Sequence, residues 1–290
     1  MKKIYDTLMP VDALASALDG ARLRELVVLD CSFELTDPQA GRAAYDAAHI
    51  PGACYVHLED TLSAAKTGSN GRHPLPDRDS FVRAMATLGI DDDTQVVAYD
   101  NAGGMYAARL WWMLRWIGHR AAAVLDGGIA GWRAADLPVT GEAPPPATAG
   151  NLALHPSLVT TVDYDMLCAN LESGERLVID ARAPDRFRGE NETMDPVGGH
   201  IPGARNRLFR DNLGADGRFK PPAMLRAEFE ALAGGRAPIE LVSQCGSGVT
   251  ACHNLLAMEI AGLSGAALYP GSWSEWCAQP GARIATGAAA

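Results

Sequence analysis

A cysteine followed by two glycines is the pattern in this chain with the clearest chemical potential. An apolar run over 239–244 ends at Cys245, and Gly246 and Gly248 precede a helical pattern over 249–262. A tight loop at a helix start points several backbone N–H groups at one place, and the helix dipole adds positive potential there. Such a loop favours a thiolate and holds an anionic substrate group. We therefore expect Cys245 to be a nucleophile, since a purely structural cysteine does not need the flanking glycines.

Composition limits the classes of protein to consider. The 290 residues are 48% hydrophobic and 21% charged, enough for two domains with ordinary cores. The formal net charge of -10 argues against non-specific binding to nucleic acid or to anionic membranes. The six cysteines include no C-x-x-C pair, so neither a disulfide framework nor a zinc site is indicated.

The N-terminal segment does not have the pattern of a secretion signal. Lys2 and Lys3 are basic, but Asp6 and Pro10 interrupt the apolar stretch that a signal peptide requires. No apolar run approaches the length of a transmembrane helix. We expect a cytoplasmic protein.

The landmarks around Cys245 occur twice in the same order. The sequence His-Ile-Pro-Gly-Ala stands at 49–53 and again at 200–204, and the strand-like run 27–30 returns at 177–180. Asp100 occupies the position in the first half that Cys245 occupies in the second. A repeated order of this kind indicates a tandem duplication in which only one half carries the cysteine.

Each half alternates short apolar strands with helical stretches. The expected strands are 26–30, 95–100, 121–125 and 239–244, and the expected helices include 11–20, 80–88 and 105–117. This alternation predicts an α/β fold with a mostly parallel sheet and helices on both faces. We predict a non-catalytic domain over 1–140, a proline-rich linker over 141–156 and a catalytic domain over 157–290. Ligands of such folds bind outside the carboxyl ends of the strands, where Cys245 falls.

At these residues the chain resembles the two-domain rhodanese family, the thiosulfate and 3-mercaptopyruvate sulfurtransferases. The resemblance covers nearly the whole sequence and includes both His-Ile-Pro-Gly-Ala boxes, Asp100 in the half without cysteine, and the segment 271–276. The loop Cys-Gly-Ser-Gly-Val-Thr is its most specific part. It is similar to the mercaptopyruvate branch, because the thiosulfate branch carries basic residues where this chain has Gly246 and Ser247.

The resemblance implies a ping-pong transfer of sulfur. The Cys245 thiolate takes sulfur from a small anionic donor, becomes a persulfide and passes it to a thiol, such as that of a small redox protein, or to cyanide. No metal or organic cofactor is required. The expected binding groups for the transferred sulfur are backbone N–H groups of the loop, at Gly246, Gly248, Val249 and Thr250.

The mercaptopyruvate reaction also needs a proton for the pyruvate enolate that leaves. Ser247 lies two residues after the nucleophile, where a hydroxyl is useful. The family pairs this serine with a histidine and an acidic residue from the other domain. The resemblance places these roles on His73 and Glu59, with Asp60 as the neighbouring alternative for the acid.

Arginines after the strand 177–180 are the expected ligands for the donor anion, because a guanidinium pairs with a carboxylate through two hydrogen bonds. Arg186 matches the substrate arginine of the family. A second substrate arginine of the mercaptopyruvate branch corresponds to Asp195, so Arg188 or Arg205 takes over its role or the donor is another anion such as thiosulfate. For Arg182 we expect a structural salt bridge with Asp180.

Other conspicuous residues are expected to be structural. His49 and His200 occur in both halves, including the half without the cysteine. Trp111, Trp112 and Trp116 lie at helical spacing and predict packing in a core or between domains rather than a platform for stacking a ligand. Cys252 lies two helical turns after Cys245 and is a better candidate for the core than for a resolving thiol.

Three rival functions remain to be weighed. A cysteine phosphatase needs an arginine six residues after its cysteine, and this chain has Ala251 there. A cysteine hydrolase needs room for an acyl group above the sulfur, where this loop cradles an anion. A non-enzymatic persulfide carrier or redox module would use Cys245 without turning over a donor, and only the resemblance at Ser247, His73 and Glu59 argues against it.

Overall fold

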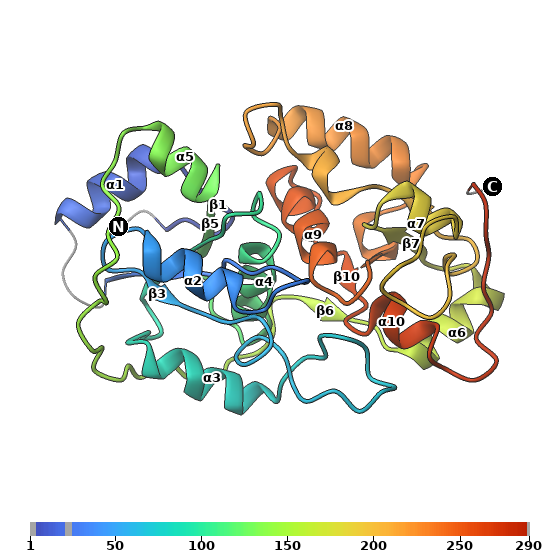
Figure 1. Ribbon diagram of the computed structural model, residues 1–290. Coiled ribbons are helices and arrows are strands. Elements are labelled where there is room, and N and C mark those ends of the chain that lie inside the picture. The colour runs from blue at the N-terminus through green and yellow to red at the C-terminus, as the bar shows by residue number, and fades with distance from the viewer. Residues whose placement is uncertain (1–3, 21–24, 289–290) are drawn as a thin grey trace. The chain divides into compact units, whose positions relative to one another are not determined.

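The computed structural model describes residues 4–20 and 25–288, which form two compact units (Figure 1). Unit 1 comprises Met1–Ala64, Pro76–Leu158 and Leu213–Phe219, and unit 2 comprises Ala65–Leu75, Val159–Asn212 and Lys220–Ala290. The ends of the domain ranges predicted from the sequence, 1–3 and 289–290, lie outside the described residues. Each unit takes one short segment from the other half of the sequence. The segment Ala65–Leu75 carries His73, so this histidine belongs to unit 2.

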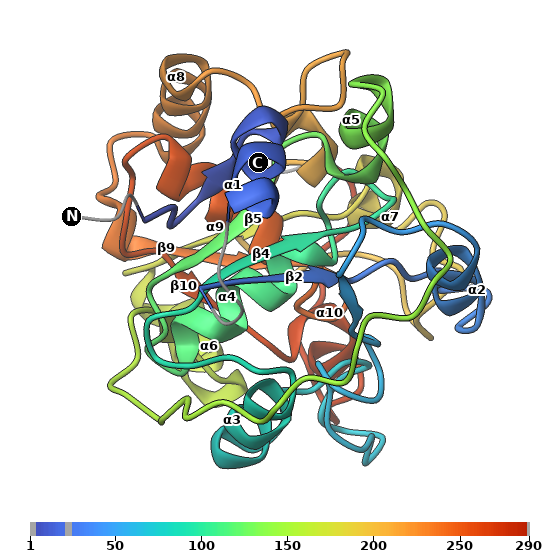
Figure 2. The same ribbon diagram turned by 90° about the vertical axis from the view of Figure 1, so that its left-hand side faces the viewer.

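Unit 1 is a five-stranded parallel sheet with helices on both faces. Its strands are β1 (Leu8–Met9), β2 (Leu26–Asp30), β3 (Cys54–Tyr55), β4 (Gln95–Tyr99) and β5 (Ala122–Leu125), in the order β1-β5-β4-β2-β3. Its helices are α1 (Val11–Gly20), α2 (Ala40–Ala47), α3 (Arg78–Thr87), α4 (Ala107–Trp116) and α5 (Gly128–Ala134). Figure 2 shows α1 and α5 on one face of this sheet and α3 and α4 on the other.

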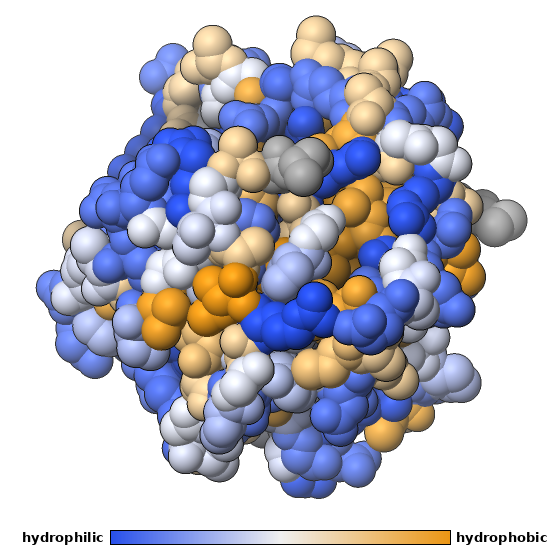
Figure 3. Space-filling view, turned by 90° about the vertical axis from the view of Figure 1, so that its right-hand side faces the viewer, coloured by the Kyte–Doolittle hydropathy of each residue, from blue (hydrophilic) through white to orange (hydrophobic). Residues whose placement is uncertain are grey.

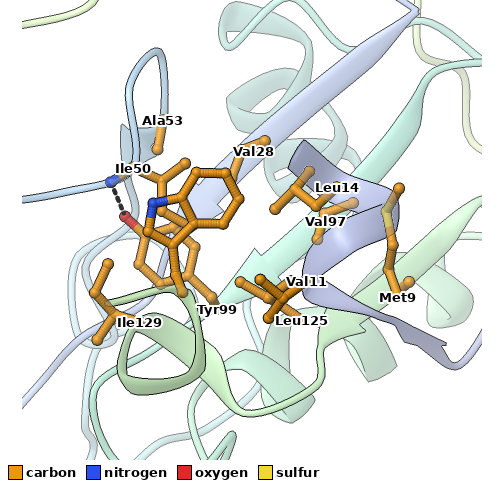
Figure 4. Packing of buried hydrophobic residues seen from close by; sticks show 12 residues of the cluster. Met9, Val11, Leu14, Val28, Ile50, Ala53, Val97, Tyr99, Leu125 and Ile129 are labelled. Carbon is orange, nitrogen blue, oxygen red and sulfur yellow. Dashed lines mark hydrogen bonds between the residues drawn. The ribbon is translucent and has the colours of Figure 1, made fainter. Parts of the chain in front are cut away.

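The face under α1 and α5 is a dry core built from alternate strand residues. Val97 and Tyr99 of β4 point into it and meet Leu14 of α1 and Ile129 of α5 (Figure 4). The hydroxyl of Tyr99 accepts a hydrogen bond from the backbone N–H of Ile50 at 3.1 Å, so its polar atom is satisfied inside the core. The other face of β4 is also buried, as expected for a parallel sheet covered on both sides.

Unit 2 repeats this architecture. Its strands are β6 (Thr160–Thr161), β7 (Leu177–Asp180), β8 (Arg205–Asn206), β9 (Leu241–Gln244) and β10 (Ala267–Leu268), in the order β6-β10-β9-β7-β8. Its helices are α6 (Tyr164–Ser173), α7 (Pro184–Arg188), α8 (Pro222–Ala233), α9 (Thr250–Ile260) and α10 (Ser272–Trp276), with 3-10 turns η1 (Phe209–Asn212) and η2 (Pro238–Glu240). The identical strand order confirms the predicted α/β duplication.

The predicted start of the strand before Cys245 is wrong by two residues. Ile239 and Glu240 belong to η2 rather than to β9, and the Ile239 side chain is 66% exposed. Pro238 opens this turn, and the Glu240 carboxylate accepts the backbone N–H of Ala237 at 2.6 Å. The local hydrogen bond competes with strand pairing, which begins only at Leu241.

Two of the three tryptophans of α4 are core residues, and the third is half-buried. Trp111 and Trp112 are each 1% exposed. Trp116 lies half-buried at the end of the helix, where it stacks on Trp112 with ring centroids 6.1 Å apart. The Arg78 guanidinium covers its ring at 5.5 Å.

The predicted linker is an ordered, extended strap on unit 1. The backbone N–H of Leu152 donates to the carbonyl of Ile90, and that of His155 donates to the carbonyl of Ile117. The Asp91 side chain accepts the N–H of Asn151 at 2.7 Å. These bonds explain how a segment without periodicity keeps a fixed path.

The repeated histidines are structural, as their presence in both halves suggested. His49 stacks on Tyr45 with ring centroids 3.9 Å apart and bonds the carbonyl of Tyr45 through Nδ1. His200 stacks on Phe187 at 3.7 Å and bonds the carbonyl of Phe187 in the same way. Each histidine therefore connects its own turn to the helix that precedes it, α2 in the first half and α7 in the second.

None of the helices in the described ranges is long and apolar enough to cross a membrane. The face of the molecule in Figure 3 carries hydrophilic side chains over most of its area, with smaller apolar areas between them.

Candidate active site

The Cys245 loop lies at the point in unit 2 where the strand order reverses. From β7 the chain moves outward to β8, and it then returns to β9 on the other side of β7. The loops that follow β7 and β9 therefore diverge from neighbouring strand ends, and the N–H of Ala181 donates to the carbonyl of Gln244 at 2.8 Å. Parallel α/β sheets bind ligands at such reversal points.

The segment 269–274 holds the Cys245 loop in place. The hydroxyl of Ser272 accepts the backbone N–H of Cys245 at 3.1 Å, and the N–H of Trp273 donates to the Cys245 carbonyl at 3.0 Å. Gly248 has a φ of 75°, and a β-carbon there would lie 2.4 Å from the carbonyl oxygen of Pro270. Only glycine satisfies both restrictions at this position.

One N–H group of the loop points at the sulfur of a buried cysteine, and the contacts expected of Gly246, Gly248, Val249 and Thr250 stay predictions. Cys245 is 2% exposed, and the backbone N–H of Ser247 points at its Sγ at 3.5 Å. Helix α9 then begins at Thr250, and its N-cap residue, Val249, makes no side-chain capping bond. Helix α6, in contrast, is capped by the Asp163 carboxylate. A helix start carries partial positive charge, so we expect the first turn of α9 to stabilise an anion bound at this loop.

Unit 1 shows what the same loop does when an anion is part of the chain. The buried Asp100 carboxylate accepts four backbone N–H groups before and at the start of α4, at 2.8–2.9 Å. The donors are Ala102, Gly104, Tyr106 and Ala107. This loop type is therefore an anion cradle, and in unit 1 an aspartate fills it.

Ser247 and His73 form a buried pair beside the cysteine. Nδ1 of His73 lies 2.8 Å from Oγ of Ser247, and the two residues are 1% and 6% exposed. The pair joins residues far apart in the sequence within one compact unit. Because Nδ1 faces the serine, a carboxylate that orients this ring would have to act at Nε2.

The two acidic candidates for that third role lie in unit 1. Glu59 is half-buried, and its backbone N–H donates to Nδ1 of His57 at 3.3 Å. The Asp60 side chain is 81% exposed, and its carboxylate lies 3.3 Å from Nδ1 of His57. The involvement of either carboxylate with His73 stays a prediction.

Two guanidinium groups lie against the loop at Gly246. A β-carbon at this glycine would lie 2.8 Å from Nη2 of Arg72 and 3.8 Å from the terminal nitrogens of Arg186. Arg186 was predicted from the sequence, whereas Arg72 was not. Its position directly before His73 is the signal that could have identified it, since a loop that delivers one residue to a site delivers its neighbour as well.

Buried carboxylates hold these arginines. Arg186 donates to Glu192 at 2.8 Å and to Asp195 at 3.2 Å, and Arg72 donates to the other oxygen of Asp195 at 2.6 Å. Burial alone would raise the pKa of Glu192, but hydrogen bonds from Arg186 and from backbone N–H groups bring it below its usual value.

Arg182 has the structural role expected of it. It donates to Asp180 at 2.7 Å, with both side chains almost fully buried, and its guanidinium lies 4.6 Å from the ring centre of Trp273. This stack fixes the start of α10, and through it the hydrogen bond from Trp273 to the Cys245 carbonyl. Arg182 therefore stabilises the Cys245 loop indirectly, through Trp273.

The two alternative cations occupy a different part of unit 2. Arg188 and Arg205 line a cavity of about 350 Å³ together with Phe187, Asn206 and other residues, and no member of the Cys245 loop lines it. Arg188 pairs with Glu190 at 2.7 Å, and Arg205 donates to the carbonyl of Leu232. A contact of Arg188 with the donor remains a prediction that this position does not favour.

The thiol of Cys252, in helix α9, belongs to the core. Cys252 is 0% exposed, and its thiol donates to the carbonyl of Gly248 at 3.3 Å, which ties the helix to the loop. All six cysteines are free thiols.

Comparison with known proteins gives a consistent result. The rhodanese-like domain model matches residues 11–135 and 163–279. A probable 3-mercaptopyruvate sulfurtransferase of Pseudomonas aeruginosa is 49% identical over 92% of this chain and 95% of its own. A thiosulfate sulfurtransferase of Mus musculus is 38% identical over 98% and 97%. The structure of SseA from Escherichia coli, described as a 3-mercaptopyruvate sulfotransferase, matches with a TM-score of 0.79 and 30% identity over 93% and 99%. The chain belongs to the rhodanese family, as a two-domain sulfurtransferase.

Proposed function

We propose that this protein transfers sulfur from 3-mercaptopyruvate, through a persulfide on Cys245, to a thiol or to cyanide. The observation that carries the proposal is the Ser247–His73 pair. The serine hydroxyl lies 2.8 Å from the imidazole, and the same residue's N–H points at the cysteine sulfur at 3.5 Å. A proton donor and the nucleophile are thus two residues apart on one rigid loop.

In the first half-reaction the Cys245 thiolate attacks the sulfur of the donor. An S–S bond forms, the C–S bond breaks, and the electron pair of that bond becomes the enolate of pyruvate. A proton from the Ser247–His73 pair converts the enolate to pyruvate, and the cysteine is left as Cys–S–SH. Thiosulfate needs no such proton, because its leaving group is sulfite. A proton donor at this place therefore favours the mercaptopyruvate reaction.

In the second half-reaction the acceptor attacks the outer sulfur of the persulfide. A thiol acceptor becomes a persulfide and cyanide becomes thiocyanate, and the electron pair of the broken S–S bond returns to Cys245. The N–H of Ser247 and the first turn of α9 are the groups that we expect to stabilise the sulfur anions in both halves.

Donor preference is the test of this proposal. The rates of pyruvate release from 3-mercaptopyruvate and of sulfite release from thiosulfate are measured with the same acceptor, and kcat/KM is compared. We expect the higher value with 3-mercaptopyruvate. A higher kcat/KM with thiosulfate would contradict the proposal and make thiosulfate sulfurtransferase the main activity.

Detection of the intermediate separates an enzyme from a persulfide carrier. After donor is added without acceptor, peptide mass spectrometry should find one additional sulfur atom on Cys245. Addition of cyanide should remove it and release thiocyanate. A persulfide that forms but does not turn over with any acceptor would support the carrier function instead.

A further inference from the structure

Asp195 joins the two arginines that lie against the Cys245 loop. Its two carboxylate oxygens accept hydrogen bonds from different guanidinium groups, Arg72 at 2.6 Å and Arg186 at 3.2 Å. The Asp195 side chain is 3% exposed, whereas the two arginine side chains are 20% and 19% exposed. A buried carboxylate thus holds two cations whose outer faces reach the surface.

The charges in this network cancel. Arg72 and Arg186 contribute two positive charges, and Asp195 and Glu192 contribute two negative charges. The neighbouring Arg182–Asp180 pair adds no net charge. The side chains beside Gly246 therefore offer guanidinium hydrogen bonds without a net positive field.

We infer that Asp195 sets the charge of the donor that the site accepts, favouring a monoanion over a dianion. The two candidate donors differ in this respect, since 3-mercaptopyruvate carries one carboxylate and thiosulfate carries two negative charges. Two guanidinium groups whose charges are balanced by carboxylates can still bind one carboxylate of the donor through hydrogen bonds. They provide no additional electrostatic attraction for a second negative charge. Asp195 acts through the arginines and is thus a positioning residue. The inference rests on the proposed function only in its choice of donors.

Removal of this one charge is the direct test. Asp195→Asn keeps the shape and one hydrogen-bond acceptor but leaves the network with one net positive charge. We expect kcat/KM for thiosulfate to rise relative to that for 3-mercaptopyruvate by roughly five- to tenfold, mostly through KM, because a cation a few ångströms away acts twice as strongly on a dianion. Asp195→Glu, which keeps the charge, should restore the ratio of wild-type protein.

A matched control removes a charge elsewhere in unit 2. Glu230→Gln abolishes the exposed pair of Arg226 and Glu230 on α8, and it changes the total charge by the same amount. The donor ratio should not change in this variant. If Asp195→Asn lowers kcat/KM by the same factor for both donors, the carboxylate only holds the two arginines in position, and the inference is overturned.

A second readout does not depend on turnover. Iodoacetamide is uncharged, and anions bound at the loop slow its reaction with Cys245, which is followed by peptide mass spectrometry. We expect the sulfate concentration that protects Cys245 from alkylation to be roughly five- to tenfold lower in Asp195→Asn than in wild-type protein. The protecting concentration of pyruvate should decrease by a smaller factor. Equal shifts for the two anions would overturn the inference. If wild-type protein uses neither donor, the proposed function fails while this protection experiment still decides the role of Asp195.

Discussion

At the scale of single residues, Ser247 contacts both the proposed nucleophile and a buried histidine. Its backbone N–H points at Cys245 Sγ, and its hydroxyl bonds His73. Neither contact alone is specific to one reaction, because any anion-binding loop directs N–H groups at its ligand. In the proposed reaction the combination is specific, since it places a hydroxyl that can relay a proton close to the sulfur that attacks the donor.

Ser247→Ala should therefore slow one donor more than the other. It keeps the N–H on the sulfur and removes only the hydroxyl. We expect kcat with 3-mercaptopyruvate to fall by roughly 100-fold, the usual scale of acid–base assistance, with little change for thiosulfate. Stopped-flow measurement of pyruvate and sulfite release, with persulfide formation as the common endpoint, checks this.

His73→Gln provides the partner for a double-mutant cycle. If serine and histidine act as one proton donor, the double variant should be no slower with 3-mercaptopyruvate than the slower single variant. Additive losses would show that the two residues act separately. An equal loss with both donors would make Ser247 a general part of the loop.

At the scale of elements, helices α4 and α9 solve the same problem in two ways. Each begins just after a central strand of its sheet. In unit 1 the Asp100 carboxylate accepts four backbone N–H groups at this place, whereas in unit 2 the N–H of Ser247 points at the sulfur of Cys245. The two halves thus place a carboxylate and a thiol at corresponding helix starts.

Asp100→Ala should destabilise unit 1 much more than loss of an ordinary cap. It leaves four N–H groups without their acceptor in a buried place, so we expect the free energy of unfolding to fall by about 2–4 kcal/mol. Asp100→Asn, which keeps the shape, should fall between this variant and wild-type protein. Urea unfolding followed by circular dichroism measures the change.

The control is Asp77→Ala, which removes the exposed N-cap of α3 in the same unit and should cost less. Hydrogen exchange locates the effect, because the amides of Ala102, Gly104, Tyr106 and Ala107 should lose protection in Asp100→Ala but not in Asp77→Ala. Equal losses of stability in the two variants would mean that Asp100 is only a common helix cap.

The sequence allowed most of these elements to be predicted, because their signals are local. Strand β2 has the predicted bounds, and α9 differs from its predicted range by a residue or two at each end. The start of β9 was missed because Glu240 bonds the backbone at Ala237, a local competition that hydrophobic pattern does not show. The degree of burial of Trp116 could not be predicted, since helical spacing assigns a residue to one side of the helix but does not show how far neighbouring elements cover it.

The candidate site was only partly predictable. Cys245 and its loop are contiguous in sequence, and their chemistry can be inferred from spacing. Arg72 joins the site through a bond to Asp195, more than a hundred positions away, and no periodicity reports such a contact. The resemblance identified Asp195 only as a missing arginine, whereas the structure shows it as the link between two other arginines.

At the scale of the whole molecule, the overall charge opposes the anionic donor. The net charge is -10, and the arginines beside Gly246 are balanced by carboxylates. The net charge therefore does not attract an anionic donor over a long distance, and we expect its binding to depend on short-range hydrogen bonds at the site. Salt screens the long-range repulsion, with a Debye length of about 10 Å at 0.1 M, but has little effect on buried hydrogen bonds.

A pair of probes of similar size tests this balance. Iodoacetate is an anion and iodoacetamide is neutral, and both alkylate a thiolate. We expect the ratio of their rates at Cys245 to rise by roughly two- to threefold, in favour of iodoacetate, between very low salt and 0.1 M salt, because screening weakens the repulsion by the protein. A ratio that falls with salt would show instead that the local cations govern the approach. Potassium gluconate in place of potassium chloride separates screening from chloride binding in the loop, since only the small anion can compete there for the N–H groups.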